Sequence, residues 1–253
     1  MAEKVLKDCR LLVGGYDISG NTNTMTVTMS ADILDKTAFG SSFRKRKSGL
    51  KSFEMTGSGF WDSSTDPANR LGGFDSGLFN EVAGSSQTLT VAEGSTGSKA
   101  ILTHGIGASY APGGAVGELM GFDFAAQGNG PTVFGKLVRA STMKGSSGEG
   151  IAVNIGTATT STKKLYAALH VIKGTTKSGH TVDVQIINDA SSAMSSPTTV
   201  GGFTQLKTTD HHVRLMWATT KASTENGWYQ VIWKASTVAA KVRAYVSIGK
   251  QKG

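Results

Sequence analysis

The sequence has little of several features that commonly stabilise or mark a protein. It contains a single cysteine, Cys9, so no disulfide can form within the chain. Proline is scarce, at 4 residues, and charged residues make up only 17%. No apolar run approaches the ~20 residues of a membrane span, and the opening residues lack the apolar core of a signal peptide. We therefore expect a chain that is made in the cytoplasm and is not inserted into a membrane.

Catalytic and metal-binding motifs are also missing. The histidines are not spaced as in an HExxH motif or a cysteine and histidine zinc site. They are His104, His170, His180, His211 and His212. There is no phosphate-binding loop and no GxSxG motif. Asp32 and Asp35 could share one face of a helical turn at residues 31–35, but ties to Thr37 and to nearby basic residues explain this pair without a glycosidase. We predict no enzyme activity and no cofactor.

Glycine, serine and threonine are abundant, and glycine alone accounts for 33 residues. This composition is typical of an all-β protein with many turns, because β-branched residues suit strands and glycine suits tight corners. Residues 25–29 and 51–60 alternate between apolar and polar side chains, as two strands of a hairpin would. The connection between them is too long for a tight turn, so the sequence predicts a long hairpin with a mobile, polar tip.

This hairpin is the predicted assembly arm. Its tip combines aromatic and basic side chains, namely Phe39, Phe43, Arg44, Lys45, Arg46, Lys47 and, on the returning strand, Lys51. Two exposed aromatic residues on a mobile arm favour burial against a partner surface. Four consecutive cations without interleaved aromatics lack the stacking platform of a single-strand nucleic-acid binder. A solvated loop, or a loop that becomes ordered against a neighbouring subunit, is therefore preferred over a DNA-binding arm.

Strand-like runs divide the chain into two predicted domains. Four runs complete a first β domain, residues 1–143, and residues 75–84 carry the signals of one short helix. The four runs are residues 87–91, 99–107, 115–126 and 131–140. Residues 144–150 (KGSSGEG) read as a linker. Six further runs predict a second sandwich, immunoglobulin-like or jelly-roll-like, at residues 151–253, with a long loop at residues 189–200. These runs are residues 151–155, 164–173, 181–188, 213–218, 227–234 and 241–248.

Basic residues are concentrated in the second half of the chain. Residues 1–145 contain 14 Lys and Arg against 13 Asp and Glu, whereas residues 146–253 contain 12 against 5. With Trp228, Tyr229 and Trp233 on one strand, this half could bind a glycan or another anionic surface. The same three aromatics could equally belong to the core.

The arm carries the pattern ADxLDxTxFG, followed by two arginines and then GLK. The residues are Ala31, Asp32, Leu34, Asp35, Thr37, Phe39, Gly40, Arg44, Arg46, Gly49, Leu50 and Lys51. This pattern resembles the N-terminal part of tail tube proteins of long-tailed, non-contractile bacteriophages. The second half is similar to the carboxy-terminal sandwich appended to some phage tail proteins.

The resemblance implies a tail-tube β-sandwich or barrel with one flanking helix. It implies a virion protein of the tail, assembled in the bacterial cytoplasm as stacked hexameric rings. Its partners would be other copies of itself, other tail proteins, and the tape-measure protein and DNA in the channel. The channel of such a tube is expected to be acidic, whereas the first half of this chain is nearly neutral. The alternatives are a decoration or neck protein, or a virion protein that contacts a receptor or glycan.

Overall fold

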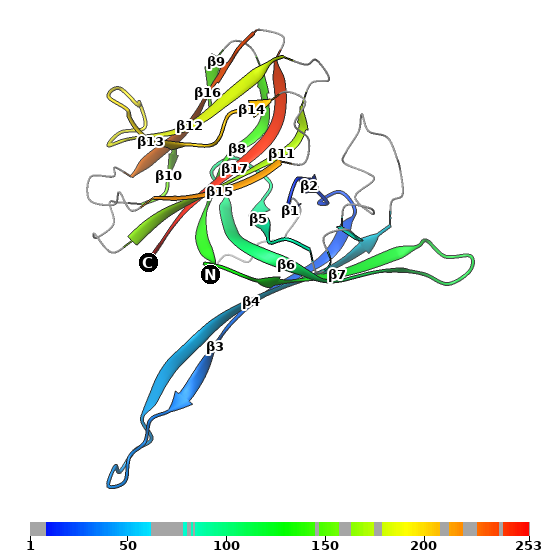
Figure 1. The fold of residues 1–253 in the computed structure, drawn as a ribbon, viewed down its shortest axis with the longest axis vertical. Coiled ribbons are helices and arrows are strands. Elements are labelled where there is room, and N and C mark those ends of the chain that lie inside the picture. The colour runs from blue at the N-terminus through cyan, green and yellow to red at the C-terminus, as the bar shows by residue number, and fades with distance from the viewer. Residues whose placement is uncertain are drawn as a thin grey trace.

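The computed structural model describes most of the chain. The described residues are 9–61, 78–79, 82, 84–144, 147–156, 163–174, 179–207, 213–219, 227–237 and 240–252. The described residues form two antiparallel sheets, which confirms the all-β prediction (Figure 1).

The larger sheet has 11 strands. They are β1 (Cys9–Val13), β2 (Tyr16–Asp17), β3 (Thr22–Asp35), β4 (Arg46–Phe60), β5 (Gln87–Glu93), β6 (Lys99–Gly113), β7 (Gly121–Gly128), β8 (Val133–Lys144), β11 (Lys163–Gly174), β15 (Val213–Thr219) and β17 (Lys241–Lys252). Its main path runs β15-β11-β17-β8-β6-β5-β1-β2, and β7, β4 and β3 continue from β6 in that order.

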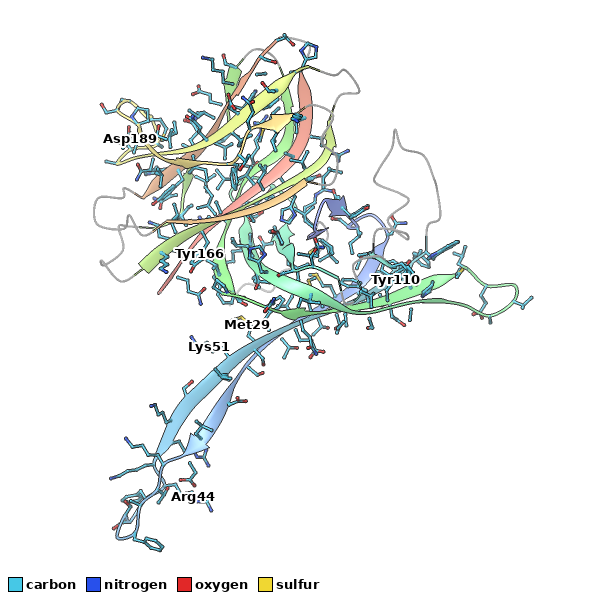
Figure 2. All side chains as sticks on the ribbon, in the orientation of Figure 1. Met29, Arg44, Lys51, Tyr110, Tyr166 and Asp189 are labelled. Carbon is cyan, nitrogen blue, oxygen red and sulfur yellow. The ribbon has the colours of Figure 1, made fainter. Side chains whose placement is uncertain are left out.

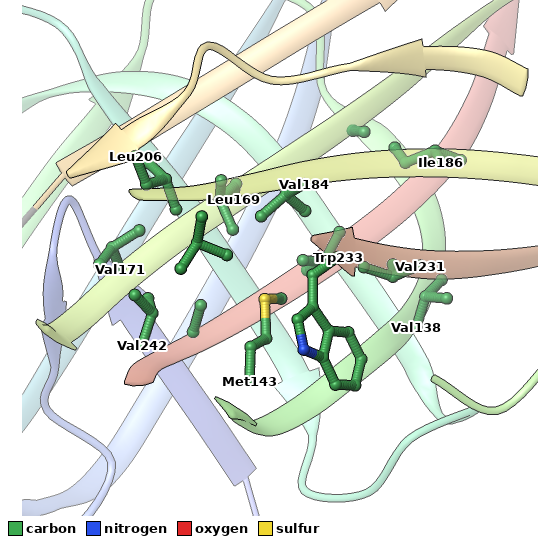
Figure 3. Packing of buried hydrophobic residues seen from close by; sticks show 14 of the residues in the cluster. Val138, Met143, Leu169, Val171, Val184, Ile186, Leu206, Val231, Trp233 and Val242 are labelled. Carbon is green, nitrogen blue, oxygen red and sulfur yellow. The ribbon is translucent and has the colours of Figure 1, made fainter. Parts of the chain in front are cut away.

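The smaller sheet has 6 strands and packs over one end of the larger one. They are β9 (Ser147–Glu149), β10 (Val153–Asn154), β12 (Thr181–Asp189), β13 (Thr198–Gly202), β14 (Leu206–Lys207) and β16 (Trp228–Ala235). A large buried cluster fills the space between this sheet and strands β8, β11 and β17 (Figure 3). Val184 and Val231 from one sheet and Leu169 and Val242 from the other are among its members. This cluster is the core of a β-sandwich in the second half of the chain.

Strand β8 links the two halves. Its first residues pair with β6, from Lys99↔Lys136 to Leu102↔Val133, and most of its length pairs with β17. Within the predicted linker, residues 147–149 form β9 and pair with β16. The larger sheet is thus continuous across the predicted domain boundary, and the division into domains stays a prediction.

A second core lies in the first half of the chain, where β3, β4 and β7 fold over β1, β5 and the start of β6. Leu11, Phe53, Met55, Phe122 and Phe124 are among its buried residues. The predicted helix at 75–84 falls largely outside the described residues. Leu78 and Phe79 are helical, and Leu78 is buried in this core.

Buried polar contacts tie the N-terminal strands to the C-terminal sheet. His170 on β11 is fully buried, and its Nδ1 donates to the Gly14 carbonyl at 2.6 Å. Because a carbonyl can only accept, Nδ1 carries the proton, and in the neutral ring Nε2 accepts from the Thr90 hydroxyl at 2.7 Å. Tyr245 on β17 donates its hydroxyl to the Asp17 carboxylate at 2.9 Å. These contacts join segments far apart in sequence, so they fix the two cores relative to each other.

This arrangement makes stability depend on pH. Burial lowers the pKa of His170 from 6.5 to about 4, although the Gly14 carbonyl and the Asp17 charge oppose the shift. Between pH 6.5 and pH 4, His170 is protonated in the unfolded chain but neutral in the folded chain. The free energy of unfolding therefore falls as pH falls. The loss from His170 should be about 2 kcal/mol at pH 5 and about 3 kcal/mol at pH 4.

Urea midpoints at pH 7.5 and pH 5 measure this effect. We expect a His170→Gln variant to be less stable than the parent at pH 7.5 and to show a smaller drop at pH 5. Equal drops for parent and variant would show that other groups cause the acid sensitivity.

Candidate assembly surface

The arm is an extended two-stranded ribbon that projects from the body (Figure 1). β3 and β4 pair from Thr22↔Gly59 out to Asp35↔Arg46. Both strands are therefore longer than the sequence predicted, and residues 31–35 belong to β3. The prediction of a helical turn there was wrong. In this two-stranded ribbon both faces are exposed, so a strand can form without the buried face that alternating apolar residues would reveal. In this ribbon Asp32 and Asp35 lie on opposite faces, so they do not form a carboxylate pair.

Several residues of the ADxLDxTxFG and GLK pattern meet at a bulge halfway along the arm. The register shifts between Ala31 and Ile33, so that Gly49 and Leu50 lie opposite Asp32 alone. A Cβ on Gly49 would lie 2.9 Å from the Asp32 Cβ and 3.4 Å from the Leu34 Cγ. A side chain at position 49 would thus collide with the opposite strand, which explains glycine at this position.

The arm tip, residues 36–45, is closed by local hydrogen bonds. The Thr37 amide donates to the Asp35 carboxylate at 2.8 Å, and the Lys45 amide donates to the Thr37 hydroxyl at 3.0 Å. The bonds from Thr37 lower the pKa of Asp35 below its usual value. Gly40 turns the chain with a φ of 85°, a left-handed conformation that suits glycine. These residues therefore shape the tip rather than form a catalytic site.

Large apolar side chains on the arm face solvent. Phe39 is fully exposed, Phe43 is 85% exposed, and Ile33, Leu34 and Leu50 are also exposed. Isolated exposed apolar residues are ordinary, but five on one projecting ribbon form a surface that favours a partner.

Basic side chains surround these apolar residues. Arg44, Lys45, Arg46, Lys47 and Lys51 are all exposed, with Arg44 at the end of the arm and Lys51 nearer the body (Figure 2). Arg46 lies directly opposite Asp35 in the ladder. The arm therefore offers a mixed apolar and cationic surface to its surroundings.

At the root of the arm, the four-stranded segment β3-β4-β7-β6 has two different faces. One face carries Phe53, Met55, Phe122 and Phe124 into the core. The other, which we call the hydroxyl face, carries Thr24, Thr26, Thr28, Ser30, Ser52, Glu54, Thr56, Ser58, Ser109, Ala111, Asp123, Ala125 and Gln127. These described residues include two carboxylates and no lysine or arginine. Phe60 follows Ser58 on the same face and is 50% exposed, so the face ends in one apolar side chain. The sequence predicted alternation in the first strand but did not show that neighbouring strands would extend this polar face.

This segment is open on both sides. Within the described residues β3 pairs only with β4, and residues 109–113 of β6 pair only with β7. Unpaired strand edges expose backbone donors and acceptors that another strand can satisfy. The hydroxyl face is thus bounded by two edges that can pair with other chains.

The predicted C-terminal binding residues lie mostly inside the protein. Tyr229 is completely buried and Trp233 is 7% exposed, both in the core of the sandwich, while Trp228 is half-buried. Arg139 covers the Trp233 ring, with its guanidinium carbon 4.5 Å from the ring centroid. A sugar cannot stack on rings that the core already covers, so Tyr229 and Trp233 do not form the aromatic platform.

The described part of the chain contains no group of three histidine, cysteine, aspartate or glutamate residues that could hold a metal. The described residues include no helix long and apolar enough to cross a membrane. His211 and His212 lie outside the described residues.

No protein-family model matches the sequence, and no curated protein matches it either. Several solved structures do match this chain. One is a chain of the "virion of native gene transfer agent (GTA) particle", at 15% identity and a TM-score of 0.43, covering 52% of this chain and 98% of that one. A second is the SPP1 tail tube, at 8% identity and a TM-score of 0.42, covering 52% and 78%.

A third structure spans both halves of this protein. It is the SPP1 Dit (gp 19.1) protein, described as a paradigm of the hub adsorption apparatus in phages that infect Gram-positive hosts. The identity is 12% and the TM-score 0.36, over 97% of this chain and 100% of that one. The three matched chains thus come from a virion, a tail tube and an adsorption hub.

Proposed function

We propose that this chain is a structural subunit of a phage-type tail, and specifically the major tail tube subunit. Copies assemble into rings, hexameric as the tail-tube resemblance implies, and the rings stack around a channel for DNA and the tape-measure protein. The role is structural rather than catalytic, and the protein is located in the virion tail. The hydroxyl face between two open strand edges is the observation that carries this proposal.

Ring closure follows from the two edges. β3 of one copy pairs with residues 109–113 of β6 in the next, so that the four-stranded segments join into one continuous barrel. Such closure removes the exposed edges that the isolated chain carries. The phenylalanine-bearing face stays in the core of each copy, so the hydroxyl face lines the channel.

The chemistry of the hydroxyl face suits DNA passage. Glu54 and Asp123 repel phosphates, and the face offers no lysine or arginine that would bind them. The near-neutral composition of the first half is therefore compatible with a mildly acidic channel, because the cations lie elsewhere, many of them on the arm.

The arm then connects one ring to the next. Phe39, Phe43 and Leu50 become buried against an adjacent copy, and the surrounding cations fix the orientation of the contact. β3 and β4 belong to both the arm and the four-stranded barrel segment. A contact at the arm therefore also positions the channel wall.

Negative-stain electron microscopy with light scattering tests the proposal. Purified protein at increasing concentration should pass from monomers to stacked rings or hollow tubes. A chain that stays monomeric or forms only a small closed oligomer at every concentration and salt condition would refute the tube-subunit role and favour decoration or receptor contact.

A further inference from the structure

The loop between β6 and β7, residues 114–120, is a second apolar projection. Val116 is fully exposed and Leu119 is 80% exposed, with the carboxylate of Glu118 between them. The loop is held in shape: the Glu118 amide donates to the Ala115 carbonyl at 3.1 Å, and the Trp61 amide donates to the Met120 carbonyl at 2.9 Å. An apolar loop that is already shaped loses little conformational freedom on binding.

A groove of about 530 Å³ lies at the opposite end of β6. Its floor is apolar and includes Val91, Ile101 and Phe134, which are neighbours across adjacent strands. Phe134 is largely exposed. The groove therefore offers an apolar surface that the described part of the chain leaves uncovered.

The rim of the groove is cationic. Lys99 and Lys136 lie directly opposite each other in the β6–β8 ladder, and Glu93 is the acidic residue beside them. Like charges placed opposite in a ladder repel, so a carboxylate inserted beside the two lysines would relieve that repulsion. The β6–β7 loop carries matching side chains. Val116 and Leu119 would pack on the apolar floor, and the Glu118 carboxylate would lie beside the two lysines.

One chain cannot make this contact with itself. The groove lies at Ile101 and the loop follows Gly113, and twelve residues of strand span up to about 40 Å. We propose that the β6–β7 loop of one copy docks into the groove of the next copy. The contact is head-to-tail, so it closes into a ring or extends as a filament.

The proposed edge pairing would bring these surfaces together, and the inference rests on the proposed function to that extent. Pairing places β3 of the next copy beside residues 109–113, which run directly into the loop. Met25, near the start of β3, lines the groove. The docking contact is thus continuous with the barrel seam and determines which copy follows which.

Cys9 provides a direct test, because it lines the groove and is the only cysteine. In a Leu119→Cys variant, a short bismaleimide should join the introduced loop thiol of one copy to Cys9 of the next and give a ladder of covalent multimers. Burial raises the pKa of the Cys9 thiol, so the reaction is run at about pH 8.5. Adding Cys9→Ser should abolish the ladder, and Ser192→Cys, in an exposed loop between β12 and β13, should give none.

Exchanging the charges of the loop and the groove provides a second, independent test. Glu118→Lys should raise the concentration needed for assembly about tenfold, and adding Lys99→Glu and Lys136→Glu should restore it. Rings that form normally in Glu118→Lys, or that form in Leu119→Cys without a ladder, would overturn the docking contact and leave the tube proposal standing. A Cys9 thiol already shielded from a small maleimide in the monomer would also overturn it, since the groove would then be filled by its own chain. Failure of the parent to form rings at all would overturn both.

Discussion

Removing the arm is expected to abolish assembly while leaving the body folded. Ser30 and Ser52 face each other in the β3–β4 ladder, so residues 31–51 can be replaced by an Asn-Gly turn, which favours a two-residue hairpin. Most of the removed side chains are exposed. The free energy of unfolding should therefore change by less than about 1 kcal/mol. The variant should remain monomeric at concentrations where the parent forms tubes.

A matched variant separates apolar contact from arm length. Phe39→Ser with Phe43→Ser keeps the ribbon but removes two side chains that assembly would bury, each worth about 2 kcal/mol. The concentration needed for assembly should rise at least tenfold, as measured by sedimentation. Tubes of normal length from the armless variant would contradict the assigned role of the arm.

Gly135→Ala should destabilise the protein by about 3 kcal/mol, because the added methyl group collides with the backbone of β17. A Cβ at this position would lie 2.0 Å from the Ile248 carbonyl oxygen and 2.6 Å from the Gly249 Cα. Neither atom belongs to a flexible side chain, so β8 must separate from β17. Because β8 joins the two cores, the loss should appear as one cooperative transition in urea.

Gly20→Ala is the matched control. A Cβ there would meet nothing within 4 Å, so the urea midpoint should stay close to that of the parent. Equal midpoints for Gly135→Ala and Gly20→Ala would show that the β8–β17 ladder tolerates the side chain and is less rigid than its geometry indicates.

The strands of the cores were predictable because burial imposes alternation. Runs at residues 164–173, 181–188 and 241–248 correspond closely to β11, β12 and β17. The sequence predicts neither β13 nor β14. Residues 189–200, where β13 begins, are rich in serine and read as one long loop, and β14 spans only 2 residues. The low strand propensity of these short segments is outweighed by their pairing with β12, so they form strands.

The arm and the β6–β7 loop show where a single sequence is ambiguous. Residues 115–126 read as one strand, yet β7 begins at Gly121 and the apolar residues before it form an exposed loop. A hydrophobic pattern indicates burial but does not say whether the same chain or another copy provides it. For the same reason the sequence could not distinguish core from ligand platform at Tyr229 and Trp233, and only the packing of β16 decides it.

The sequence predicted an arm because phenylalanines and a basic cluster lie in a connection too long for a tight turn. The structure places these residues on an exposed ribbon, and their role in assembly stays a proposal. The hydroxyl face was not predicted, since it combines four strands that are separated in sequence by up to about 100 residues and align only through their register. Its acidic character could not be read from the net charge of the first half.

A cryo-electron microscopy reconstruction of the assembled protein would show which face lines the channel. We expect a tube whose inner wall is the hydroxyl face, with Glu54 and Asp123 toward the channel and β3 of each copy paired with β6 of the next. A reconstruction in which that face packs against another subunit, or points to the outside of the particle, would contradict this expectation.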